Sequence, residues 1–120
     1  MIHPSQVVSI HPYFKVKPGK LDEVKALLES FIARTSAEQS NLYYDFTLNE
    51  DVLFCREAYV GADGLLQHLD NVGTQLQEML KLAEVLRVEV HGAAAELEKL
   101  KGPLAALNPA WFVFLGGVTR

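Results

Sequence analysis

The spacing of the apolar residues is the feature that most constrains this 120-residue chain, because it switches repeatedly between two periods. Over 7–16 the apolar side chains alternate with polar ones, which is typical of a β-strand. Pro18-Gly19 then precede an amphipathic helical stripe that continues to about Ala37. Glycine and proline stand at most of the later switches as well. The order of the two periods therefore predicts a mixed α+β chain with short connections.

The rest of the chain extends this order. Further strands are expected over 42–48, 52–60, 85–91 and 110–115, and further helices over 63–70, 74–83 and 93–101. The order strand, helix, strand, strand, helix, strand is the split βαβ plan of a ferredoxin-like sandwich with an antiparallel sheet. We expect a single domain over 1–120, with a loose N-terminus over 1–6 and a C-terminal helix and strand over 93–120. The helices of this class cover one face of the sheet, so the other face should meet solvent or a partner.

The same patterns predict a hydrophobic core, but they leave the register of the hairpin over 42–60 open. With three loop residues Tyr44 would face Arg56, whereas a two-residue loop would exchange the two faces, because a slip of one residue turns every side chain over. The residues expected in the core are Leu28, Phe31, Phe46, Phe54, Leu69, Leu80, Val88 and Val90.

Charge and composition exclude several classes of function. The 11 basic and 15 acidic residues give a net charge of -4, so the chain lacks the positive field that attracts proteins to nucleic acid or to anionic membranes. The sequence contains no apolar run of the ~20 residues that a membrane span needs. The single cysteine, Cys55, excludes an internal disulfide and a multi-cysteine zinc site. We expect a cytoplasmic protein without a secretory signal, without a metal site, and with no nucleic-acid or membrane partner.

Four stretches of sequence suggest a family. They are VKPGK at 16–20, LYYDF at 42–46, FCREAY at 54–59 and ADGLLQHL at 62–69. In order and spacing these stretches make the chain, over about 7–91, resemble the antibiotic biosynthesis monooxygenase (ABM) superfamily of dimeric α+β barrels. The resemblance implies a homodimer whose sheets pack face to face, with a pocket in each subunit between its own sheet and helices. Members include cofactor-free oxygenases of aromatic polyketides and quinols as well as haem-degrading enzymes.

Two histidines are candidate catalytic bases. His68 lies at the border of the apolar stripe of the helix over 63–70, where an imidazole can reach a pocket while one nitrogen stays bonded elsewhere. Its unperturbed pKa of about 6.5 suits removal of a phenolic or quinol proton. His91, at the end of a strand, is the second candidate. The alternative for both is structural: a half-exposed histidine bonded to a backbone carbonyl, or a residue at a strand end or an interface.

Four further residues are candidates for substrate binding. Arg56 in a pocket would stabilise an oxyanion, and Tyr44 could pair with it across the hairpin. Tyr59 could line the mouth of the pocket, and Phe46 could form an aromatic platform for the substrate. The structural alternatives are a cross-strand pair for Tyr44 and Arg56 and a core position for Phe46. Glu57 is interpreted as a hydrogen-bonded anchor.

The function predicted from these residues and from the resemblance is cofactor-independent monooxygenation of a small aromatic, quinol or polyketide-like compound. The alternative is a non-catalytic dimeric module of the same fold that binds a small apolar or aromatic ligand, or haem. Haem is the less favoured ligand, since the haem-degrading members have a tryptophan near the position of His68 and an asparagine near that of Pro12. At these two positions this chain has neither the tryptophan nor the asparagine.

Overall fold

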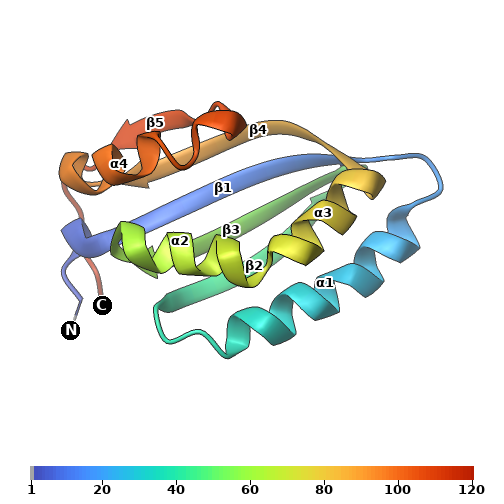
Figure 1. Cartoon of the computed structure of the whole chain (residues 1–120), viewed down its shortest axis with the longest axis horizontal. Coiled ribbons are helices and arrows are strands. Elements are labelled where there is room, and N and C mark those ends of the chain that lie inside the picture. The colour runs from blue at the N-terminus through green and yellow to red at the C-terminus, as the bar shows by residue number, and fades with distance from the viewer. Residues whose placement is uncertain (1) are drawn as a thin grey trace.

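Strand β1 (Val7–Val16) lies at the centre of a five-stranded sheet in the computed structural model, which describes residues 2–120 (Figure 1). The strand order is β2-β3-β1-β4-β5, and the first four strands pair antiparallel. This order confirms the predicted ferredoxin-like sandwich. The appended strand β5 runs parallel to β4 at the edge of the sheet. The bounds of the other strands are β2 Asn41–Asn49, β3 Val52–Val60, β4 Ala83–Gly92 and β5 Ala110–Val113.

The helices gather on one face of this sheet, as Figure 1 shows. They are α1 (Leu21–Ser36), α2 (Gly61–Asn71), α3 (Gly73–Leu82) and α4 (Ala94–Lys101), with short 3-10 helices at Pro4–Gln6 and Ala105–Leu107. None of the helices within residues 2–120 is long and apolar enough to cross a membrane.

Contacts between α2 and α4 hold the start of α2 in place. The backbone N–H of Ala62 donates to Oε1 of Glu96 at 2.9 Å, which caps the first turn of α2 from a different helix. This bond is the main reason that the pKa of Glu96 is lowered. The C-terminal extension therefore supports the helix that carries His68.

Most of the predicted core residues lie between the sheet and the helices, but two of them do not. Phe31, Val88 and Val90 are buried, and Leu28, Phe46 and Leu69 are half-buried beside them. Leu80 is 52% exposed, because Met79 takes the inward position of α3. Phe54 is on the sheet face without helices, where its ring lies 4.7 Å from that of Tyr13. The core prediction was wrong for Leu80 and Phe54.

The turn between β2 and β3 settles the register of the hairpin. Asn49 pairs with Val52, so the loop has two residues, and Glu50 in it adopts a positive φ of 55°. Tyr44 is therefore opposite Glu57, and the pairing of Tyr44 with Arg56 does not form. With this register, alternate residues of β3 from Leu53 to Tyr59 point towards the helices, and Arg56 points away from them.

We expect Phe31→Ala to lower the free energy of unfolding by about 3–5 kcal/mol, because the buried ring leaves a cavity between α1 and the sheet. Leu80→Ala is the matched control and should cost about 1 kcal/mol or less, since half of that side chain is already in water. Urea unfolding of both variants measures the difference. Equal midpoints for the two variants would contradict this description of the core.

Candidate active site

A cavity of about 120 Å³ lies between the sheet and the helices. Apolar side chains form most of its wall, and the exposed Leu80 and the half-exposed Leu107 belong to it. Four residues with a polar group reach it, namely Tyr44, Cys55, Glu57 and His68. A concave apolar pocket with a few convergent polar groups is typical of a site for a small molecule.

Glu57 is a carboxylate placed at the inner wall of this cavity. The alternation of β3 turns it towards the helices, where it is only 4% exposed. The Tyr59 hydroxyl donates to its Oε1 at 2.7 Å, and His68 Nε2 lies 3.2 Å from the same oxygen. Both contacts end on Oε1, and the Glu57 side chain lines the cavity.

His68 lies between two carboxylates. Its ring, on α2, is 2% exposed, and Nδ1 contacts Oε2 and Oε1 of Glu38 at 2.8 and 3.2 Å. Burial lowers the pKa of His68, but hydrogen bonds to Glu57 and Glu38 and their negative charges raise it by more, so the pKa lies above 6.5. An imidazolium that faces a carboxylate at each nitrogen is the arrangement that this cluster favours.

The remaining polar groups of the cavity stay neutral. Tyr44 packs its ring 5.2 Å from that of His68, and burial, with a smaller effect of Glu57, raises the pKa of its hydroxyl. Burial and Glu57 raise the pKa of the Cys55 thiol in the same way, so it does not supply a thiolate nucleophile. Burial likewise raises the pKa of Tyr59. The Tyr44 hydroxyl therefore keeps its proton and can donate a hydrogen bond to a ligand.

Taken together, these groups can perform acid–base chemistry. The buried carboxylate of Glu57 is a base, and the imidazolium of His68 and the hydroxyl of Tyr44 are donors beside it. Across residues 2–120, no group of three or more His, Cys, Asp or Glu side chains is arranged to hold a metal ion.

The structure brings some of the predicted site residues together and separates others. Tyr44, Phe46 and His68 line the cavity. Tyr59 is fully buried and bonded to Glu57, so it does not stand at the mouth. Arg56 and His91 are on the opposite face of the sheet and do not reach this cavity.

On that face Arg56 and His91 have other neighbours. Arg56 Nη2 lies 3.5 Å from Oδ2 of Asp45, and both side chains are more than half exposed. His91 stacks on Phe112 with ring centroids 4.4 Å apart and meets His11 edge-on at 4.9 Å.

The sequence did not identify Glu38, and it gave Glu57 only an anchoring role. Glu57 could have been found from the alternation of β3 had the hairpin register been known. Glu38 is in the connection between α1 and β2, thirty positions before His68. No local pattern of residues marks it.

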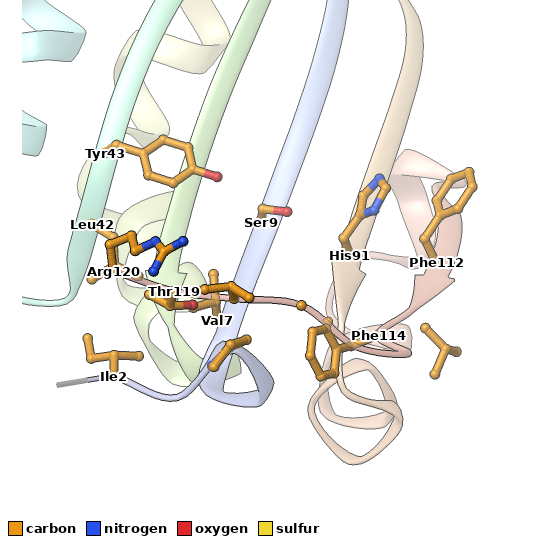
Figure 2. A pocket seen from close by; sticks show the side chains of 15 residues that line it. Ile2, Val7, Ser9, Leu42, Tyr43, His91, Phe112, Phe114, Thr119 and Arg120 are labelled. Atoms are coloured by element: carbon orange, nitrogen blue, oxygen red, sulfur yellow. The ribbon is translucent and has the colours of Figure 1, made fainter.

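A larger hollow of about 900 Å³ lies on the face without helices (Figure 2). Tyr43, Ser9, His91 and Phe112 border it, and the C-terminal residues Thr119 and Arg120 cross its edge, as Figure 2 shows. It is open, and no carboxylate side chain is among its lining residues. The acid–base cluster is confined to the inner cavity, which is therefore the candidate active site.

Comparison with solved structures shows what the chain is similar to. MupZ from Pseudomonas fluorescens is 40% identical over 96% of this chain and 95% of its own, with a TM-score of 0.91. A proposed antibiotic biosynthesis monooxygenase from Caulobacter crescentus shares 20% identity over 73% of this chain and 90% of its own, with a TM-score of 0.65. Another antibiotic biosynthesis monooxygenase shares 16% over 69% and 92%, with a TM-score of 0.61. No protein-family model and no curated protein sequence matches the chain significantly.

The histidines should titrate in opposite directions from their ordinary value. We expect the Cε1 proton of His68 to titrate above pH 6.5, and that of His11 below it, because burial and then the neighbouring His91 lower the pKa of His11. Proton NMR, with signals assigned by single His→Gln variants, measures both midpoints. A His68 midpoint at or below the ordinary value would show that burial outweighs the two carboxylates.

These shifts link stability to pH. The stabilisation from protonated His68 is complete below about pH 6.5 and is lost as the pH rises through its raised folded-state pKa. The stabilisation from neutral His11 changes with pH in the opposite direction. It is complete above about pH 6.5 and is lost as the pH falls through the lowered folded-state pKa of His11.

Proposed function

This chain belongs to the family of MupZ and has the antibiotic biosynthesis monooxygenase fold, and we propose that it is an enzyme that removes a proton from a small, largely apolar compound. The observation that carries the proposal is the buried Glu57 carboxylate, which contacts His68 Nε2 at 3.2 Å and borders an apolar cavity. His68 and Tyr44 beside it have raised pKa values, and perturbed titratable groups in a cleft are typical of active sites.

The cluster divides the work of proton removal among its members. Glu57 takes the proton from a hydroxyl or an activated C–H of the substrate. The imidazolium of His68 stabilises the Glu57 carboxylate beforehand and the substrate anion afterwards. The Tyr44 hydroxyl, kept protonated by burial, donates to the oxygen on which charge develops. The apolar wall excludes water, which strengthens each of these interactions.

The reaction that we propose is oxygenation of a phenolic, quinol or polyketide-like substrate without a cofactor. A carbanion formed next to the aromatic system gives one electron to O₂, and the two radicals combine to a peroxide. Glu57 returns its proton to the peroxide, and the hydroperoxide loses water to leave a carbonyl group. The balance is one CH₂ group and one O₂ converted to one C=O group and one H₂O.

The position of the proton donors favours a second candidate, a redox-neutral acid–base reaction such as an isomerisation or an addition. Oxygenation needs a base, whereas this cavity also presents two donors, Tyr44 and His68, beside that base. Removal of a proton from one atom of the substrate and donation to another requires both kinds of group.

Oxygen uptake with a series of quinols and phenolic polyketides, in metal-free buffer, tests the first candidate reaction. Analysis of the product for an elemental composition unchanged from that of the substrate tests the second.

Glu57→Gln should lower turnover by about 10²–10⁴-fold, since the base is lost. Arg56→Gln is the matched control. Arg56 is next to Glu57 in the sequence but lies on the other face of the sheet, so this substitution should leave turnover unchanged. His68→Gln should lower turnover at least about tenfold, and less at high pH, where the substrate ionises unaided.

Other results would overturn this assignment. Full turnover in Glu57→Gln would remove Glu57 as the base. Saturable binding of these compounds without any chemical change would identify a non-catalytic binding module, and a Soret band on titration with haem would identify haem as its ligand.

We also propose that a second copy of the chain covers the sheet face without helices. Tyr43 and Phe112 are 41% and 40% exposed there, and Val113 is 54% exposed. Large apolar side chains exposed on one face of a sheet are typical of an interface, and a stable interface buries at least about 1,000 Å².

Light scattering at micromolar concentration should give the mass of a dimer. Phe112→Glu should yield a monomer, because it places a charge in the apolar contact. Ile32→Glu, on the exposed side of α1, is the control and should remain dimeric. A monomeric wild-type protein would contradict the proposal.

A further inference from the structure

Glu38 contacts His68 at the ring nitrogen that does not face Glu57. The Nδ1 atom lies 2.8 Å from Oε2 of Glu38, whereas Nε2 lies 3.2 Å from Glu57. The Glu38 side chain is 11% exposed, against 2% for His68, and it does not line the cavity. His68 therefore lies between Glu38 and the cavity.

Although Glu38 is in a connection, its carboxylate is held by α2, and the end of α2 is in turn hydrogen-bonded to the end of α1. Asn71 Nδ2 donates to Glu38 Oε2 at 2.7 Å and to the backbone oxygen of Arg34 at 3.0 Å. Arg34 Nε donates in turn to the backbone oxygen of Asn71 at 2.7 Å. This network joins the C-terminal ends of α1 and α2, and it leaves Glu38 little freedom to turn away from His68.

The charges around His68 explain why a second carboxylate is useful. Burial disfavours the charged form of a carboxylate or an imidazole, and a neighbouring group of opposite charge favours it. The side chains that face His68 are Glu57 and Tyr59 from β3, Tyr44 from β2 and Glu38 from the connection after α1. Both tyrosines are neutral, so Glu38 is the charge that remains on His68 when Glu57 accepts a proton.

We propose that Glu38 is a positioning residue that acts through His68: it fixes the ring with Nε2 towards Glu57, and its charge keeps His68 an imidazolium, so that Glu57 stays an ionised base. The inference about catalysis rests on the proposed function, whereas the inference about His68 stands on the geometry alone. Glu38 touches neither the cavity nor the reacting atoms.

NMR titration of His68 in the substrate-free protein tests the proposal. Glu38→Gln keeps a hydrogen-bond acceptor for Nδ1 but removes the charge, so the His68 midpoint should fall by about one pH unit, a tenfold loss of proton affinity. Glu38→Asp restores the charge and should recover most of the wild-type midpoint. Glu89→Gln, which removes a carboxylate near His11 and His91 on the other face, is the matched control and should leave His68 unchanged.

An unchanged His68 midpoint in a folded Glu38→Gln protein, or an equal change in the Glu89→Gln control, would overturn the proposal. If Glu38→Gln does not fold, Asn71→Ala tests the same inference, because it removes the donor that holds Glu38 and should lower the His68 midpoint by a smaller amount. A merely structural role for Glu38 would alter the unfolding midpoint without this change in titration.

The experiment separates this inference from the proposed function. If the His68 midpoint falls as expected but no compound is turned over, the charge coupling stands and the proposed reaction fails. If turnover depends on Glu57 and the His68 midpoint does not respond to Glu38, the reaction stands and the role of Glu38 fails. Where a substrate is found, Glu38→Gln should narrow the pH range of kcat on its alkaline side, because His68 loses its proton at lower pH.

Discussion

The buried contact of His68 with two carboxylates is the interaction on which the organisation of the site depends. Three ionisable groups are held out of water, and transfer of any one of them alone into such an interior would be unfavourable by several kcal/mol. Hydrogen bonds from Tyr59 and Asn71 satisfy carboxylate oxygens that His68 alone would leave partly unpaired. A cluster of this kind adds little net stability compared with apolar packing, so its chemistry is the better explanation for its presence.

The sheet supplies this cluster through its alternation of side chains. Arg56 and Glu57 are neighbours in the sequence, yet one pairs with Asp45 at the surface and the other lies in the cavity. At the same level of the sheet, β1 pairs with β3 on either side of His11 and Pro12, whereas these two residues pair only with β4. Pro12 has no N–H to donate, and its side chain lines the cavity that the gap adjoins.

The hydrophobic periods were enough to predict the order of strands and helices, because burial of one face dictates the period of each element. They were not enough for side-chain positions that depend on a single residue of register. A two-residue turn decided the partner of Tyr44, and a register shift between β1 and β4 leaves Leu86 exposed although it continues the pattern of Val88 and Val90.

The sequence offered candidates for the site without settling which face of the hairpin lines it. His68, at the border of a helical stripe, and Tyr44 and Phe46 of the hairpin were among these candidates, and all three line the cavity. His91 was the second candidate from the sequence, and the pairing of β4 shows that it is on the other face. Glu38 reaches His68 because two helices end side by side, which is a tertiary relation without a local signal in the sequence.

The charge balance of the cluster connects the two candidate reactions. With His68 protonated, Glu57, His68 and Glu38 carry a net charge of about −1 before reaction, and the substrate is neutral. When Glu57 takes the proton, the cluster becomes neutral and the negative charge moves to the substrate, so the total buried charge does not change. The anion then lies beside an imidazolium that Glu38 still holds in place. Oxygenation and redox-neutral chemistry share this step, and they separate only afterwards, according to whether O₂ or a proton from Tyr44 or His68 meets the anion first.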